Sequence, residues 1–390
     1  MNVAAARRRV IVAFYASLNH GSEYRAGAEF IRFAAAEGFD LAVIADLEQN
    51  AQAAELSLAS HGIEVVRVPS LVTRQATLYR FSDFIPQTFW HLRVARWLAA
   101  QRVPVEILWV QNGALPWLPL APYFSLTKQV VWGPVGGGEP PPAAMMCRLR
   151  WSVRLRERLR SLMETRLLDG KSRLARKSGA PRLVCFARTV GVQERLATSL
   201  HVAVPVIPEI LDPIKAVHLA KKTGTSPRFL WVGQDIPRKN LQLALDLLTR
   251  LQVGSYPQAT LDVFGCKGTS GAVPHGVRFH GWVSRIDWLS YRDDGVLLLT
   301  SFREGLPSVI LEATANGLLC VAADVGAIST LGVDTVYTLP RHEYPNYTDD
   351  TVQALATRIR RHLDQTAIHL PPVSHEETLK HYLRAQDVIP

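Results

Sequence analysis

The sequence has few cysteines, and the four that it has are widely separated. Cys147, Cys185, Cys266 and Cys320 follow neither the paired spacing of a zinc site nor the dense pattern of a disulfide-stapled secreted domain. We therefore expect reduced thiols, no metal centre and a location in the cytoplasm.

Long apolar runs are also missing. No stretch reaches the roughly 18 residues that a membrane-spanning helix needs. Three arginines at 7–9 precede a short apolar segment at 10–16, which faintly resembles a signal peptide. Because a helical pattern follows at once, this segment is predicted to be a first buried strand. The chain has no low-complexity tract and no short-period repeat.

What the sequence does contain is the composition of a globular protein. Hydrophobic residues make up 48% of its 390 residues and charged residues 20%. This length is too great for one ordinary core and predicts two domains, with 212–226 as the link between them.

Apolar segments alternate with helical patterns through both halves of the chain. The predicted strands are at 10–15, 41–44, 63–68, 105–110, 130–132, 182–186 and 202–207, then at 228–232, 260–264, 277–280, 295–300 and 319–322. The predicted helices are at 24–37, 81–100, 190–200, 240–251 and 376–388. Such alternation predicts an α/β protein with parallel, doubly wound sheets.

The most informative stretch is 301–317, S-F-R-E-G-L-P-S-V-I-L-E-A-T-A-N-G. It follows an apolar run that predicts a buried strand, and its second half has helical spacing. Glu304 should therefore lie at a strand-to-helix turn, with Glu312 about two helical turns further on. The amides that begin this helix, at Gly305, Leu306 and Ser308, form a natural seat for an anionic phosphate.

This pattern resembles the E-x7-E signature of retaining glycosyltransferases with the GT-B fold, family four of the sequence classification. Four further segments resemble the family in the same order: 233–239 (G-Q-D-I-P-R-K, its diphosphate-binding segment), 261–265 (L-D-V-F-G, its next strand and turn), 277–283 (V-R-F-H-G-W-V, its nucleotide-side loop) and 323–326 (A-D-V-G, a strand-end turn).

The resemblance implies a GT-B fold, with two Rossmann-like, doubly wound parallel-sheet domains that face each other across a cleft. Residues 1–211 would form the acceptor-side domain and 212–373 the nucleotide-sugar domain, with a C-terminal helix at 374–390 packing back on the first domain. The implied reaction moves a sugar from a nucleotide-diphosphate donor, a UDP- or GDP-sugar, to a glycan or lipid-linked acceptor. The family requires no metal or other cofactor, and its retention of configuration is usually explained by same-face attack without a side-chain nucleophile.

Carried over to this chain, the family pattern implies Glu304, Lys239 and Arg238 as catalytic residues. Lys239 matches the family lysine, whereas the family arginine is replaced by Gln234, so Arg238 is the candidate for the second positive charge. Cations are unfavourable at the start of a helix, so Arg238 and Lys239 are expected to be held there for an anion. The alternative is that the two residues merely form a solvated helix start. The implied donor-binding residues are Gly21, Gly233, Gly305, Leu306, Pro307, Ser308 and Glu312, with Glu312 on the ribose hydroxyls.

The family's histidine on the N-terminal side has no counterpart here, because Gly133 and Pro134 stand at its place. The glycine-rich stretch that begins there is predicted to line the cleft with backbone amides, at Gly133, Gly136 and Gly137. The alternative is a flexible loop.

Positive charge is concentrated at 148–177, which holds eleven Lys and Arg against three Asp and Glu. At about 100° per residue, its apolar side chains cluster on one face with arginines on both sides. This layout favours a helix that lies in an anionic membrane interface. Such a helix would attach the protein to the inner face of the membrane, which suits a lipid-linked acceptor in bacterial cell-surface polysaccharide synthesis. The face consists of Trp151, Leu155, Leu159, Leu162 and Met163.

The basic segment has two alternative interpretations: an amphipathic helix that packs on the core, and a nucleic-acid patch. Aromatic residues are too sparse for us to expect nucleic acid.

Two other functions fit the same donor motifs: a sugar-nucleotide epimerase, which needs no acceptor, and a non-catalytic sugar-nucleotide-binding protein. A Rossmann dehydrogenase is disfavoured, because 133–138 lacks both G-x-G-x-x-G spacing and the acidic partner expected downstream.

Overall fold

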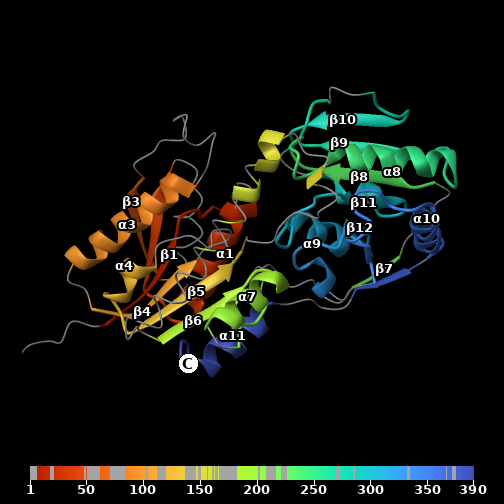
Figure 1. The fold of residues 1–390 in the computed structure, drawn as a ribbon. Helices are drawn as coiled ribbons and strands as arrows, with labels where there is room; N and C mark the ends of the chain where they lie inside the picture. The colour runs from red at the N-terminus through yellow and green to blue at the C-terminus, as the bar shows by residue number, and fades with distance from the viewer. Residues whose placement is uncertain are drawn as a thin grey trace, which may run out of the picture. The chain divides into compact units, whose positions relative to one another are not determined.

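The computed structural model describes most of the chain and forms two compact units, each built on a parallel sheet (Figure 1). Unit 1 comprises Met1–Glu139, Arg160–Asp212 and Ser374–Pro390, and unit 2 comprises Pro140–Leu159 and Pro213–Val373. The described residues are 7–17, 22–47, 50, 62–70, 84–101, 104–111, 120–136, 146–147, 151–155, 157–159, 162, 166, 182–200, 203–207, 217–220, 226–268, 272–283, 286–331, 334–365, 367–370 and 375–390.

The sheet of unit 1 has six parallel strands in the order β3-β2-β1-β4-β5-β6. Its strands are β1 (Arg8–Ala13), β2 (Leu41–Asp46), β3 (Glu64–Pro69), β4 (Val105–Gln111), β5 (Gln129–Val135) and β6 (Arg182–Ala187). Its helices are α1 (Ser22–Ala36), α3 (Phe84–Ala100), α4 (Ala121–Phe124), α7 (Val190–Leu200) and α11 (Glu376–Ala385). This is the doubly wound order that alternating strands and helices predict.

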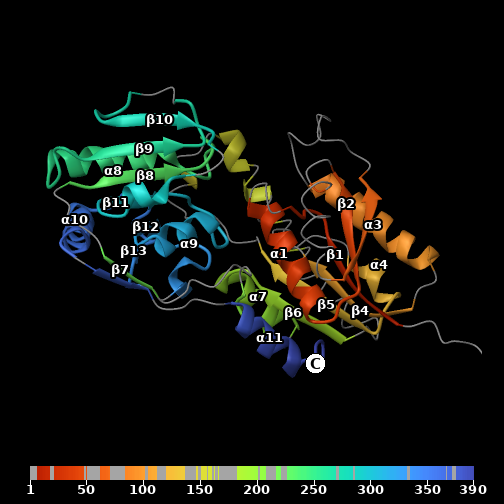
Figure 2. The ribbon, with the colours of Figure 1, turned by 180° about the vertical axis from the view of Figure 1, so that it is seen from behind.

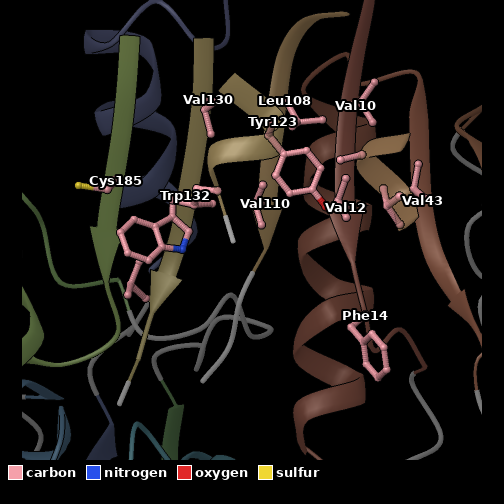
Figure 3. Packing of buried hydrophobic residues seen from close by; sticks show 14 of the residues in the cluster. Val10, Val12, Phe14, Val43, Leu108, Val110, Tyr123, Val130, Trp132 and Cys185 are labelled. Atoms are coloured by element: carbon pink, nitrogen blue, oxygen red, sulfur yellow. The ribbon is translucent and has the colours of Figure 1, made fainter. Parts of the chain in front are cut away.

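Helices cover both faces of this sheet because successive side chains of each strand point to opposite faces. Val10, Val12 and Phe14 pack with the core under α3, α4 and α7, which Figure 3 shows around Tyr123 and Trp132. The other face packs against α1 and α11, and α1 lies in front of the strands in the reverse view (Figure 2).

The C-terminal helix α11 belongs to unit 1 and is held there by polar as well as apolar contacts. The Tyr382 hydroxyl donates to the carbonyl of Cys185 in β6 over 2.8 Å. Arg182, at the start of the same strand, pairs with Asp387 just after the helix at 2.8 Å. The end of the chain is thereby fixed to the edge strand of the first sheet.

Unit 2 repeats the arrangement, with a six-stranded parallel sheet in the order β10-β9-β8-β11-β12-β13. Its strands are β8 (Arg228–Val232), β9 (Thr260–Phe264), β10 (Val277–Gly281), β11 (Gly295–Leu299), β12 (Leu319–Ala323) and β13 (Val336–Leu339). The longer helices are α8 (Leu241–Val253), α9 (Ser308–Ala315) and α10 (Asp349–Leu363), with short 3-10 helices η3 (Trp288–Tyr291) and η4 (Ile328–Leu331). Right-handed crossovers place α8 and α9 on opposite faces, because strand order reverses between β8 and β11.

The structure confirms the α/β class and most of the predicted elements, and corrects several others. The expected strand at 202–207 is an isolated bridge between Ala187 and Val206. The segment expected to link the domains contains β7 (Val217–Ala220), which pairs antiparallel with β14 (Ala367–Leu370). Both strands, and β13, were missed because four-residue strands carry too little periodicity to stand out.

A buried carboxylate ties β9, β10 and η3 of unit 2 together. Asp262 in β9 is only 1% exposed. It accepts two hydrogen bonds from Arg278, at 2.9 and 3.1 Å, one from His280 at 2.7 Å and one from the Tyr291 hydroxyl at 3.0 Å. Burial works to raise the pKa of Asp262, but the hydrogen bonds from His280, Arg278 and Tyr291 outweigh it and hold the pKa below its ordinary value.

We expect Asp262→Asn to lower the stability of the protein by about 2 kcal/mol at pH 7, because charge-assisted hydrogen bonds are lost. A folded-state pKa below the unfolded one stabilises the fold above about pH 4, and this stabilisation disappears as the pH falls through the folded value. The gap between wild type and variant should therefore narrow in acid, measured by urea unfolding at several pH values. Asp246→Asn, at an exposed residue of α8, is the control; equal effects of the two changes would contradict the account.

Candidate functional site

The candidate site lies where the strand order of the second sheet reverses. The neighbours β8 and β11 lead to helices on opposite faces, and ligands of doubly wound sheets bind beyond the carboxyl ends of such strands. The segment 233–240 follows β8, and the segment 300–307 follows β11. The two motifs that the sequence singles out therefore meet at one point of the fold.

Buried polar contacts hold these two loops together. The Thr300 hydroxyl, after β11, accepts from the Trp231 indole N–H over 3.0 Å and lies 3.0 and 2.8 Å from the carbonyl oxygens of Lys239 and Asn240. Tyr344 donates its hydroxyl to the Thr300 carbonyl over 2.6 Å and accepts from the Asn240 amide over 2.7 Å. The backbone leading into the site is thus fixed on both sides.

At the centre, one carboxylate binds two cations. Glu304 Oε1 lies 2.7 Å from Lys239 Nζ, and Oε2 lies 3.0 Å from Arg238 Nη1. The Glu304 side chain is 9% exposed, Lys239 18% and Arg238 39%. Arg238 also donates to the carbonyl of Arg303 over 3.1 Å, and the amide of Phe302 donates back to the carbonyl of Arg238 over 3.1 Å.

These cations keep Glu304 ionised. Burial works to raise its pKa, but the charges of Lys239 and Arg238 and the hydrogen bonds from Lys239 and Ser301 together hold the pKa below its ordinary value. The cluster of three side chains carries a net charge of about +1, partly shielded from water, which is the local field an anionic ligand would meet.

Arg238 is the second cation that contacts Glu304, beside Lys239. Gln234, where the resembling family has arginine, is exposed. Gly233 packs against the Lys239 stem, and a Cβ there would lie 3.4 Å from Lys239 Cγ and 3.2 Å from the Trp231 ring. A glycine at this position lets the lysine fold back over the end of β8.

A second glycine lets a neighbouring loop touch the Glu304 backbone. Gly326, after β12, has φ +67°, and a Cβ on it would lie 2.2 Å from the Gly305 carbonyl oxygen and 2.3 Å from that of Glu304. The Ala327 amide donates to the same Gly305 carbonyl over 3.0 Å. The turn at 323–326 is thus the support on which the Glu304 loop lies.

Helix α9 begins right after this loop, with Pro307 as its N-cap residue. The Leu306 side chain is 1% exposed and anchors the loop in the core, so Leu306 can offer a ligand only its backbone. Ser308 opens the helix and is partly exposed, and Glu312 is exposed one to two turns further along. The first-turn amides of a helix have no partners within it, so this end attracts anions.

The glycines on the N-terminal side do not lie in the structure as the sequence predicts. Gly21 and Gly137 lie outside the described residues. Gly133 was expected in a loop but lies within β5, buried, where a Cβ would come within 2.7 Å of the Phe186 ring; β5 runs on to Val135 because Gly133 has no side chain to clash. Gly136 directly follows the strand and is also buried.

Much of the basic segment 148–177 lies outside the described residues, but its first part is helical at 151–155 and 157–159. Four of the five apolar side chains expected on one face are described, and all are exposed: Trp151 by 76%, Leu155 by 50%, Leu159 by 52% and Leu162 by 52%. In the part of the chain that is described, no helix has both the length and the apolar character needed to cross a membrane.

Several residues of the site carry no sequence signal. Thr300 and Tyr344 act through a hydroxyl whose partner is distant in sequence, and Glu157 binds Arg303 across 146 positions. No motif or periodicity marks such pairs. Among the described residues, no group of three or more His, Cys, Asp and Glu could hold a metal ion.

Comparison with known proteins finds a family match in the second half of the chain. Residues 226–365 match the model of the family "Glycosyl transferases group 1". The matched segment contains all of the Arg238–Lys239–Glu304 cluster and both loops that hold it. No curated protein matches the sequence.

Solved structures share the fold of the whole chain at low identity. Sucrose-phosphate synthase from Thermosynechococcus elongatus has a TM-score of 0.57 and 13% identity, with 97% of this chain and 94% of that one covered. The lipopolysaccharide outer core galactosyltransferase WaaB has a TM-score of 0.56 and 13% identity, covering 97% and 99%. An E. coli structure described as trehalose-6-phosphate bound with UDP-2-fluoro glucose has a TM-score of 0.54 and 12% identity, covering 97% and 95%. These similarities confirm the GT-B fold.

We expect Gly326→Ala to destabilise the protein by about 2 kcal/mol or more, because a side chain at positive φ is strained and its Cβ would displace the Glu304–Gly305 backbone. Gly268→Ala is the matched control, since a Cβ there meets nothing within 4 Å, and it should change stability by less than about 0.5 kcal/mol. Urea unfolding measures both. A Gly326→Ala protein as stable as the control would show that the loops do not touch as described.

Proposed function

We propose that this protein is a retaining glycosyltransferase that moves a sugar from a UDP- or GDP-sugar to a glycan or lipid-linked acceptor in bacterial cell-surface polysaccharide synthesis. The observation that carries the proposal is the Arg238–Lys239–Glu304 cluster, beside the N-terminus of α9 and inside the segment that matches the glycosyl transferases group 1 model. Among the structures with this fold, one is a lipopolysaccharide galactosyltransferase and another contains a UDP-sugar analogue.

The cluster supplies what departure of a nucleoside diphosphate requires. Negative charge grows on the diphosphate as the bond to the sugar breaks, and preorganised cations and amides stabilise that charge without rearrangement. Lys239 and Arg238 are the cations, and the amides at Gly305 and Ser308 are the dipoles. In this proposal the diphosphate binds to the positive charges of Lys239 and Arg238, which Glu304 neutralises only in part in the free protein.

The two glutamates have separate roles. Glu304, held at the centre of the cluster, lies beside the donor sugar or its phosphate. Glu312, exposed on α9, accepts hydrogen bonds from the ribose hydroxyls, since a carboxylate is a pure acceptor and suits a vicinal diol. The nucleotide base lies toward the end of β10, where Trp282 directly follows the strand and is 80% exposed.

Retention follows from attack on the same face of the sugar. The acceptor hydroxyl forms a bond to the anomeric carbon as the bond to the diphosphate oxygen breaks, and the departing phosphate oxygen takes the hydroxyl proton. No side-chain nucleophile and no metal take part, so the charge on the leaving group is balanced by the protein's cations.

The exposed face of Trp151, Leu155 and Leu159 supports peripheral attachment to an anionic membrane from the cytoplasmic side. Each basic residue near such a surface contributes about 1 kcal/mol, so the excess charge at 148–177 is enough for reversible binding. A membrane location brings the enzyme to a lipid-linked acceptor.

Product analysis with UDP- and GDP-sugars tests the function. The proposal predicts release of the free nucleoside diphosphate, together with a glycoside of retained configuration when a polyprenyl-linked or oligosaccharide acceptor is present. Nuclear magnetic resonance of the anomeric proton distinguishes the configurations. An isomerised sugar nucleotide without acceptor would show an epimerase instead, and binding without turnover on any acceptor would show a non-catalytic protein.

A further inference from the structure

The helix that exposes the apolar face belongs to the same compact unit as the cluster. Residues 151–155 and 157–159, called the basic helix below, lie in unit 2 although 160–212 belong to unit 1. Its exposed apolar side chains, Trp151, Leu155 and Leu159, are four residues apart and form one stripe. Glu157 lies about 160° around the helix from the centre of this stripe and is buried.

That buried glutamate connects the basic helix to the site. Glu157 Oε2 lies 3.2 Å from Arg303 Nη1, and the side chains are only 11% and 10% exposed. An ion pair so shielded from water is hard to break, because either partner alone would be left as a buried charge. The basic helix and Arg303 should therefore move together.

Arg303 in turn directly precedes Glu304. Its carbonyl accepts from Arg238 over 3.1 Å, and Arg238 simultaneously binds Glu304 at 3.0 Å. Any shift of the basic helix that carries Arg303 with it thus changes the position of Glu304 and its cations. The chain of contacts from the exposed stripe to the cluster consists of Glu157, Arg303, Arg238 and Glu304.

The occupant that suits the stripe is an anionic lipid surface. Apolar side chains of this size enter the boundary between acyl chains and headgroups, and exposed Arg158 lies beside them on the same side of the helix. The segment 148–177 as a whole has eight more basic than acidic residues, which complements lipid phosphate.

We propose that docking of the basic helix on an anionic membrane tightens nucleotide binding at the Arg238–Lys239–Glu304 cluster through the Glu157–Arg303 ion pair. The inference rests on the proposed function, because it takes a nucleoside diphosphate as the ligand of the cluster. Docking fixes the helix, the ion pair fixes Arg303, and the loop that carries Glu304 is restrained further before the nucleotide binds. Glu157 is a positioning residue in this account, and the enzyme works best where its lipid-linked acceptor is found.

The test measures the dissociation constants of UDP and GDP by calorimetry, with and without vesicles containing phosphatidylglycerol. We expect these vesicles to lower the dissociation constant of whichever nucleotide binds by about fivefold or more, the lower end of measured couplings between sites. Linkage requires the nucleotide to tighten vesicle binding by the same factor. Vesicles of phosphatidylcholine alone should have no effect.

Variants separate docking from transmission. The double change Trp151→Ser and Leu155→Ser should abolish vesicle binding and leave the nucleotide dissociation constant in solution unchanged. Glu157→Gln should still bind vesicles but lose the vesicle effect on the nucleotide, and Glu157→Asp should restore part of it. Glu64→Gln, which removes a carboxylate from an exposed ion pair with Arg8 in unit 1, is the matched control and should behave as wild type.

The outcomes distinguish the inference from the function beneath it. Nucleotide binding that is indifferent to bound vesicles, or a vesicle effect that persists in Glu157→Gln, would overturn the coupling and leave the function standing. Failure to bind phosphatidylglycerol vesicles would overturn the docking surface. If neither nucleotide binds under any condition, the proposed function and the inference both fall. Should Glu157→Gln not fold, Glu157→Asp, which keeps the charge on a shorter side chain, decides the question, because a vesicle effect as large as in wild type would overturn the coupling.

Discussion

The site depends on the attraction between one carboxylate and two cations. Lys239 and Arg238 are adjacent in sequence and lie just before the start of α8, where both their mutual repulsion and the helix dipole oppose them. The Glu304 carboxylate offsets this repulsion, because it lies 2.7 Å from Lys239 and 3.0 Å from Arg238. The cluster still has one positive charge in excess. The free protein thereby holds two adjacent cations in place with this excess charge, as the proposed binding of a diphosphate requires.

The rest of unit 2 can be understood as the support of that cluster. The reversal of strand order brings the two loops to one edge, and Thr300 and Tyr344 join them by hydrogen bonds. Gly233 allows the Lys239 stem to lie against the end of β8, and Gly326 allows its loop to contact the Glu304–Gly305 backbone. A side chain at either glycine would stand in the way. The Glu157–Arg303 pair adds a distant helix to the same support. Few of these groups would touch a ligand, yet each determines where a ligand-binding group lies.

Sequence patterns predicted most of what has a regular period or a local motif, although the helix α10 was not predicted. The doubly wound order, the turn at Glu304 and the buried strands follow from apolar runs, spacing and the glycine after the helix, and the structure has all of them except the strand expected at 202–207, which is an isolated bridge. The meeting of Glu304 with Lys239 was implied by a family resemblance and required the strand order to bring the two loops together. Sequence could not show that Gly133 continues a strand or that Glu157 reaches Arg303, because both depend on contacts between residues far apart in the chain. The short pair β7 and β14 was missed because four-residue strands carry too little periodicity to stand out.

The central claim is that Lys239 and its neighbours bind a nucleoside diphosphate without a metal. The most direct measurement is a thermal-shift titration of the purified protein with UDP, GDP, ADP and TDP, in EDTA and in Mg²⁺. A ligand that binds the folded state alone stabilises it by about 2.7 kcal/mol at a hundred times its dissociation constant. The account predicts such a shift with one nucleotide, equal in EDTA and Mg²⁺ and lost in Lys239→Ala. A shift that needs Mg²⁺, one that survives in Lys239→Ala, or none with any nucleotide would contradict it.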